Sequence, residues 1–245
     1  MKSYIGITGF ADKEEVINVS RSLLPDMSRK LMVGVLVSNK TLNGGTNKYP
    51  NRYPKMDRIG QIFVNDSCFI NMVHYYTDDQ TSLCAQLEKV MSYIGEFCNG
   101  IQLNMSWPNP NDLKRFKKNF PHKKIVLQIN RMMLQEIPSR LVTRCLADYE
   151  NLIDYVLLDA SGGRGKELEI DFLLPYVDSF RNFLNGVNIV VAGGLWSSNL
   201  YCLKPLLEIY PNLSIDAEGM LRDGNDDLSI IKAKNYLHEA MTLLG

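Results

Sequence analysis

The chain has neither an excess of one charge nor a long hydrophobic run. Its 245 residues include 27 Lys and Arg against 27 Asp and Glu, so the formal net charge is zero. Proteins that bind nucleic acid or anionic lipid usually carry an excess of Lys and Arg. A membrane helix needs roughly 20 consecutive apolar residues, and the best apolar stretch, residues 31–38, has only the length of a strand. We therefore expect neither a nucleic acid nor a membrane partner.

Cysteine motifs and a secretion signal are also missing. The five cysteines are widely spaced and contain no CxxC pair, so no disulfide framework is indicated, and we interpret them as reduced, mostly buried thiols. The chain enters an apolar strand at Tyr4 without the regions of a signal peptide. These features predict a cytoplasmic protein. Because no group of ligand-type residues has metal spacing, we expect no metal and no cofactor.

Short β-branched runs alternate eight times with amphipathic stretches, which is the pattern of repeated strand–helix units. We expect strands at residues 4–8, 31–38, 69–75, 100–104, 125–130, 155–159, 188–192 and 213–216. We expect helices at residues 12–24, 81–95, 111–120, 134–146, 170–185, 197–210 and 226–244. Eight such units with right-handed crossovers close naturally into a (β/α)8 TIM barrel, with an open doubly wound sheet as the alternative. No linker divides the chain, so we predict a single domain over residues 1–245.

Local signals mark the ends of several of these helices and one unusual interval. Asp12 and Ser197 are suitable N-caps, and Pro121 and Pro211 follow predicted helix ends. Residues 40–60 are rich in Gly, Pro, Asn and Tyr, which predicts a long loop before a short helix. A loop of this length is either functional or a tolerated insertion.

Polar residues end most of the predicted strands, and this end of a TIM barrel carries the active site. They are rich in amides and sparsely charged, which suits a small polyhydroxylated ligand. These residues are Thr8, Ser38, Asn39, Lys40, His74, Gln102, Asn104, Gln128, Asn130, Asp159, Gly193, Gly194, Asp216 and Glu218. His74 is a candidate general base, although a hydrogen-bonded structural histidine is an equally open interpretation. Asp216 and Glu218 are two residues apart and could form an acid–base pair or a cation site.

Glycines cluster after the last three predicted strands. They occur at residues 162–165, at Gly193 and Gly194, and at Gly219, which could open a short extra helix. Glycine lets backbone N–H groups approach a phosphate closely, and the loops after strands seven and eight form the usual phosphate site of this fold. The clusters therefore predict a phosphorylated ligand.

Several segments together resemble phosphoribosylanthranilate isomerase, a TIM-barrel enzyme of tryptophan biosynthesis, along nearly the whole chain. The matching residues are Tyr4-Ile5-Gly6-Ile7-Thr8, Val33-Gly34-Val35-Leu36-Val37, Ile101-Gln102-Leu103-Asn104, Leu157-Leu158-Asp159 with Gly162-Gly163-Arg164-Gly165-Lys166, and Ala192-Gly193-Gly194-Leu195. The Leu-Leu-Asp sequence followed by Gly-Gly-x-Gly-Lys is the most specific of them.

The resemblance implies a reaction and assigns residues to it. The family rearranges an aminoaldose to an aminoketose with a strand-one Cys as base and a strand-six Asp as acid, which places the acid at Asp159 and Ile5 at the position of the base. The family's basic residue after strand two has Lys40 or Arg52 as its substitute. The strand-eight Ser-Ser-Gly motif is replaced here by residues 217–219. Glu218 in that segment would repel a phosphate unless it turned away or paired with Arg222.

We therefore expect an aldose–ketose isomerase that acts on a small phosphorylated metabolite, as a monomer or homodimer. We expect Asp159 and His74 to be catalytic, Lys40, Arg52, Gln102, Asn104 and Gln128 to bind substrate, and Gly163, Gly193, Gly194, Glu218 and Gly219 to bind phosphate. The alternative is a catalytically lapsed barrel that binds a phosphometabolite or a protein partner as a sensor or scaffold. A lyase with a Lys Schiff base is disfavoured because no Lys lies inside a predicted strand.

Overall fold

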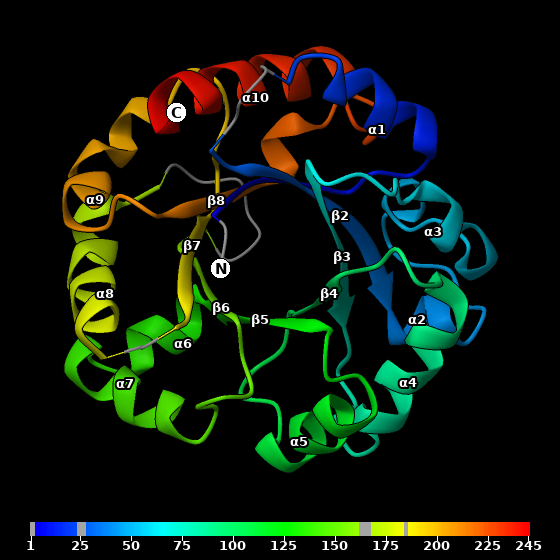
Figure 1. The fold of residues 1–245 in the computed structure, drawn as a ribbon, viewed down its shortest axis with the longest axis horizontal. Coiled ribbons are helices and arrows are strands. Elements are labelled where there is room, and N and C mark those ends of the chain that lie inside the picture. Colours follow the sequence, from blue (N-terminus) through cyan, green and yellow to red (C-terminus); the bar gives the residue numbers. More distant parts are fainter. Residues whose placement is uncertain (1–2, 24–27, 162–167, 184–185) are drawn as a thin grey trace.

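Eight parallel strands close into a barrel in chain order, with helices around the outside (Figure 1). The computed structural model describes residues 3–23, 28–161, 168–183 and 186–245. The strands are β1 (Tyr4–Thr8), β2 (Lys30–Ser38), β3 (Phe69–Tyr76), β4 (Gly100–Leu103), β5 (Lys124–Asn130), β6 (Tyr155–Asp159), β7 (Asn188–Ala192) and β8 (Ser214–Ala217). The predicted TIM barrel is confirmed, and each strand end differs from its predicted position by at most one residue.

The helices follow the strands around the barrel. Short 3₁₀ turns lie in three of the segments that follow strands, namely those after β2, β7 and β8. The α-helices are α1 (Lys13–Ser20), α2 (Asn39–Leu42), α3 (Met56–Ile62), α4 (Leu83–Ile94), α5 (Pro110–Asn119), α6 (Arg131–Glu136), α7 (Ser139–Ala147), α8 (Ile170–Phe183), α9 (Lys204–Ile209) and α10 (Ile230–Leu244). The 3₁₀ turns are η1 (Pro50–Arg52), η2 (Leu200–Leu203) and η3 (Gly219–Leu221). As predicted, a long loop precedes a short helix in residues 40–60, but the loop covers only residues 43–55, is interrupted by η1, and follows the short helix α2. Gly219 opens a short turn, as expected.

The caps explain where the helix predictions held and where they were wrong. Asp12 caps α1 in a capping box with Glu15. The helix predicted at residues 134–146 is two helices, because Pro138 lacks an N–H and α7 restarts after it. Ser197 is not a cap, since η2 begins after Asn199. The last helix starts after Ser229, which accepts from the Lys232 N–H, rather than at residue 226.

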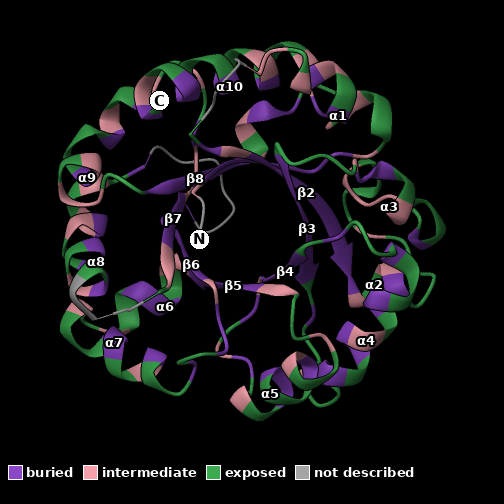
Figure 2. Cartoon of the chain, viewed as in Figure 1, coloured by how far each residue is buried: buried purple, intermediate pink, exposed green. Residues whose placement is uncertain are grey.

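The strands are almost wholly buried (Figure 2). Successive side chains along each strand point to opposite faces of the barrel wall, which produces two apolar layers. One set of side chains fills the barrel interior, and it includes Tyr4, Met32, Tyr155 and Leu157. The other set packs between the barrel and the helices. Because side chains alternate along a strand, the residues that continue the interior set toward the strand ends face the mouth of the barrel.

The cysteines test one further expectation. All five cysteines are free, but only Cys84 and Cys98 are buried, whereas Cys68 is exposed. The expectation of mostly buried thiols was therefore wrong. None of the helices in the described part of the chain is long and apolar enough to cross a membrane.

Candidate functional site

A cavity of about 100 Å³ lies at the mouth of the barrel, where the strands end. Its lining consists of Arg52, His74, Gln102, Asn104, Gln128, Leu157, Asp159, Ser161, Ala192, Gly193, Gly194, Asp216, Glu218 and Gly219. Most of the residues selected from the sequence are thus brought together in one cavity. Lys40 is not among them and lies exposed on α2, and Gly163 lies outside the described residues.

A hydrogen-bonded row of side chains crosses the cavity floor from β3 to β6. His74 Nε2 lies 2.8 Å from Gln102 Nε2 and 3.0 Å from Gln128 Oε1. Gln102 Nε2 also donates to Gln128 Oε1 at 3.1 Å, and Gln128 Nε2 donates to Asp159 Oδ2 at 3.2 Å. All four side chains are buried. The two amides therefore connect the imidazole to the carboxylate and hold both in place.

His74 is less suited to act as a base than the sequence indicated. Its Nε2 contacts both Gln102 and Gln128, and a neutral imidazole nitrogen either donates or accepts. Burial lowers the pKa of His74, against smaller opposing effects of Glu218, Gln128 and Asp159. The Nε2 atom of His74 is thus engaged by both amides, which fixes the orientation of the ring within the row.

The Asp159 carboxylate accepts hydrogen bonds from Gln128 on β5 and from Ser161, which follows β6. Besides Gln128, the backbone N–H and the hydroxyl of Ser161 donate to its Oδ1 at 3.0 and 2.9 Å. Gly193, at φ +112°, allows β7 to end close by, since a Cβ there would lie 3.0 Å from Asp159 Oδ1 and 2.8 Å from the Ser161 nitrogen. The Asp159 carboxylate therefore accepts every hydrogen bond described for it and faces the cavity in a fixed orientation.

Asp216 is a second buried carboxyl group in the same cavity. Thr8 Oγ1 lies 3.0 and 2.9 Å from its two oxygens. Burial raises the pKa of Asp216 to about 8, helped by Glu218 and Asp159 and opposed by the Thr8 hydrogen bond. The sequence predicts Asp216 only as a possible partner of Glu218 in an acid–base pair or cation site, and not as a site residue. Its interior position, two residues after the buried Ser214, was the signal available.

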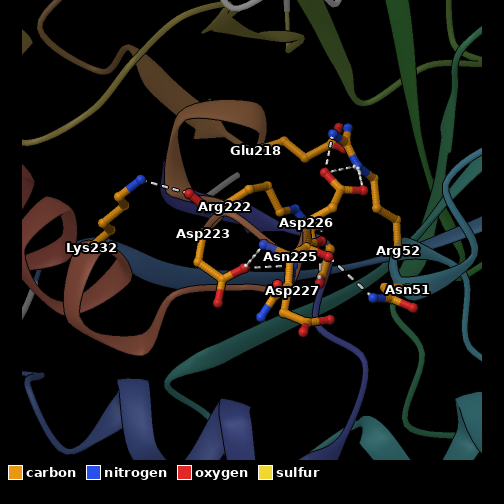
Figure 3. A network of polar contacts seen from close by, with 10 residues as sticks. Asn51, Arg52, Glu218, Arg222, Asp223, Asn225, Asp226, Asp227 and Lys232 are labelled. Atoms are coloured by element: carbon orange, nitrogen blue, oxygen red, sulfur yellow. Dashed lines mark hydrogen bonds and ion pairs between the residues drawn. The ribbon is translucent and has the colours of Figure 1, made fainter.

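The long loop after β2 contributes Arg52 to the cavity lining, and Figure 3 shows its guanidinium beside Glu218 and Asp226. Arg52 Nη1 lies 3.0 Å from Glu218 Oε1, and its Nε donates to Asp226 Oδ2 at 2.8 Å. Of the two arrangements considered for Glu218, turning away or pairing with Arg222, neither is the one found, since its described ion pair is with Arg52. Arg222 instead donates to the carbonyl oxygens of Gly9 at 3.2 Å and Asp226 at 3.4 Å. Arg52 thus links the loop after β2 to the segment that follows β8, through ion pairs with Glu218 and Asp226.

The family's base position does not face this cavity. Ile5 is buried in the layer between the barrel and the helices, with Val16 and Val19 of α1. Its neighbours Tyr4 and Gly6 have the opposite orientation. A proton acceptor for a ligand at the mouth therefore has to come from another strand.

The described lining carries three carboxyl groups, from Asp159, Asp216 and Glu218, and one guanidinium, from Arg52. These charges favour a ligand with several hydroxyl groups over an apolar one. Among the residues that the structure describes, no group of three or more His, Cys, Asp or Glu side chains is arranged to hold a metal ion.

The fold resembles several solved structures. Phosphoribosylanthranilate isomerase from Thermotoga maritima superposes with a TM-score of 0.66 at 16% identity, covering 98% of this chain and 99% of that one. The tryptophan synthase alpha subunit of Legionella pneumophila superposes at 0.60 and 9% identity, covering 99% and 92%. The putative copper homeostasis protein CutC of Streptococcus agalactiae superposes at 0.55 and 12% identity, covering 89% and 98%. No family model and no curated protein matches the sequence. At these identities the similarity establishes the TIM-barrel fold alone.

Proposed function

We propose that this protein is an aldose–ketose isomerase that acts on a small phosphorylated sugar derivative at the mouth of the barrel. The observation that carries the proposal is the buried row from His74 through Gln128 to Asp159, which ends at the cavity. Buried polar side chains that are joined and fixed at a cavity are typical of a catalytic site. The amide-rich lining supplies both donors and acceptors for sugar hydroxyl groups.

The reaction requires proton transfers and no external oxidant or reductant. In the aminoaldose case, protonation of the ring oxygen breaks its bond to C1 as the nitrogen lone pair forms a C1–N double bond. A base then removes the proton on C2, and that electron pair forms a C1–C2 double bond. Loss of the C2 hydroxyl proton and protonation of C1 give the ketone. Asp159 is placed to exchange a proton with the bound substrate.

The phosphate would lie near the ends of β7 and β8. Gly193 and Gly194 have positive φ angles and expose backbone at the cavity. At Gly219 an added Cβ would meet no atom within 4 Å, so there is room beside its backbone. The Glu218 carboxylate, which would otherwise repel a phosphate, is paired with Arg52.

Phosphoribosylanthranilate is the first substrate to test, because the sequence resemblance and the fold both lead to it. The superposition with the solved isomerase covers almost the full length of both chains. The reaction would belong to tryptophan biosynthesis, and we expect a cytoplasmic protein that acts as a monomer or homodimer. The positions of Ile5 and of residues 217–219 differ from the family, so the proposal rests on the site's own geometry.

The test is the decay of phosphoribosylanthranilate fluorescence with the wild-type chain, Asp159→Asn and Asp171→Asn. Asp171 is exposed on α8 and serves as the matched control. We expect turnover by wild type and control, and a loss of about 10² to 10⁴ in kcat for Asp159→Asn with KM little changed. Equal decay with and without wild-type protein would overturn the assignment to this substrate. Saturable binding of phosphoribosylanthranilate without decay would instead support the alternative of a catalytically lapsed barrel that only binds its ligand.

A further inference from the structure

We infer that Asp216 is the second proton-transfer residue of the cavity, donating a proton to the substrate while Asp159 accepts one. Asp159 then has the reverse of the acid role that the family resemblance implies for it. This inference rests on the proposed function and divides its proton transfers between two strands. It also gives Asp159 a second proton-transfer group in the same cavity. Strand β1 cannot provide one at the family's base position, because Ile5 there faces the helices and not the mouth.

The strand register places the two carboxyl groups at one level of the barrel. Asp159 is paired with Ala192 on β7, and Ala192 is paired with Asp216 on β8. Neighbouring strands are about 4.8 Å apart, so the two backbones are separated by roughly 10 Å. Both side chains continue the interior set of their strands and line the cavity. The two carboxyl groups therefore border the same cavity from β6 and from β8, where a ligand could contact both.

Neighbouring small residues make the room that Asp216 occupies. Gly6 is paired with Asp216 across β1 and β8, and a Cβ at Gly6 would lie 2.7 Å from Asp216 Oδ1. Gly34 on β2 does the same for Thr8, since a Cβ there would lie 2.5 Å from Thr8 Oγ1. Two glycines on adjacent strands thus accommodate the Thr8–Asp216 pair, and a purely apolar barrel interior would not need this arrangement.

The groups around Asp216 favour its protonated form at neutral pH. Asp159 on β6 and Glu218 beyond β8 are carboxylates, and Tyr4 on β1 and Tyr236 on α10 have pKa values raised by burial and by Asp216 itself. The Tyr4 and Tyr236 hydroxyls have no hydrogen-bond partner in the structure. None of these four groups is a cation, and the hydrogen bond from Thr8 opposes burial only in part.

The two carboxyl groups therefore enter the reaction in complementary states. Asp216 carries a proton that it can give to the ring oxygen of the substrate, and its own electron pair stays on the carboxylate. Asp159 accepts all the hydrogen bonds described for it, so it is available to take the proton from C2. Asp159 then returns that proton to C1, while the C2 hydroxyl gives its proton to the deprotonated Asp216, so both groups regain their starting state.

The first test is the pH dependence of phosphoribosylanthranilate turnover in wild type, Asp216→Asn and Thr8→Val. We expect wild-type kcat to fall as pH rises through about 8, and Asp216→Asn to lose 10² to 10⁴ in kcat. Thr8→Val removes the hydrogen bond that lowers the Asp216 pKa, so its descending limb should move to higher pH. Wild-type rates in Asp216→Asn, or an unmoved limb in Thr8→Val, would overturn the inference.

The second test needs no substrate and separates the two proposals. In protein with ¹³C-labelled aspartate carboxyls, we expect one signal to titrate near pH 8 and to vanish in Asp216→Asn. The same signal should titrate at lower pH in Asp159→Asn, because the Asp159 charge raises the Asp216 pKa. An Asp216 signal that titrates below pH 5 overturns the inference whether or not phosphoribosylanthranilate reacts. Wild-type protein that leaves the substrate unchanged overturns the proposed function alone.

Discussion

Asp159 and Asp216 lie at the same level of the barrel with only Ala192 between them in the strand register. Their surroundings nevertheless differ. Asp159 accepts hydrogen bonds from Gln128 and Ser161, whereas burial raises the pKa of Asp216 despite the opposing hydrogen bonds from Thr8 and from the Ala217 backbone. A buried carboxyl group that keeps its proton and a neighbouring carboxylate that accepts hydrogen bonds can divide an acid and a base role at one pH.

Gly6 should be the position at which the smallest change disturbs Asp216 most. In Gly6→Ala the new methyl group would lie 2.7 Å from Asp216 Oδ1 and 2.8 Å from Met32 Cε. Overpacking of this kind costs about 1 to 3 kcal/mol. We expect thermal unfolding to show that loss and the Asp216 carboxyl titration to shift. Gly224→Ala is the matched control, because a Cβ there meets no atom within 4 Å. A normal titration in Gly6→Ala would contradict the close fit.

The free energy of unfolding should fall as the pH rises from 4 to 8, and Asp216 should be a main cause. Its pKa is raised from 3.8 to about 8 on folding, so the folded state holds a proton that the unfolded chain releases near pH 4. The stabilisation is complete below pH 4 and is lost as pH rises through 8, by roughly 6 kcal/mol in total. Urea unfolding of Asp216→Asn should show a flatter pH dependence than wild type. Parallel profiles would contradict this prediction.

Arg52 should hold the loop after β2 against the mouth. Arg52→Gln removes the ion pairs with Glu218 and Asp226, each of which is partly exposed and worth up to about 1 kcal/mol. We expect amide hydrogen exchange in residues 43–53 to become about five-fold faster. The control is Arg181→Gln, which loses a pair with Asp178 on α8. Unchanged exchange in the loop would show that other contacts hold it.

The phosphate subsite can be tested by filling it. Gly219 and Gly224 both have open space beside their backbone and no positive φ, so a side chain at either is tolerated. Only Gly219 lines the cavity. We expect Gly219→Leu to weaken binding of inorganic phosphate at least ten-fold by calorimetry, with little change in melting temperature, and Gly224→Leu to bind as wild type does. Equal affinity in the two variants would place the anion elsewhere.

The barrel was predictable from the sequence because each strand is a short β-branched run that periodicity locates closely. Helix ends were less predictable, since they depend on single residues. Pro138 divides one predicted helix in two, and Asn199 replaces Ser197 at the start of η2. Asp226 was predicted to begin the last helix. It instead has φ +67° and binds Arg52, a contact between positions 174 residues apart that no local pattern records.

The candidate site was predictable as a set of strand ends but not as a network. The rule that strand ends meet at the mouth located His74, Gln128 and Asp159 together. It could not show that two amides occupy His74 Nε2, because that depends on side-chain reach across three strands. The partner of Glu218 was missed for a similar reason, since Arg52 arrives on a long loop whose path the sequence does not specify.

The most direct measurement is a double-mutant comparison of turnover in wild type, Asp159→Asn, Asp216→Asn and the variant with both changes. Residues that act as one catalytic unit are strongly non-additive, so removing the second costs little once the first is gone. We predict that each single variant loses at least about 100-fold in kcat and that the double variant is within a few-fold of the slower single variant. A wild-type rate in either single variant, or losses that multiply in the double variant, would contradict a shared role in proton transfer.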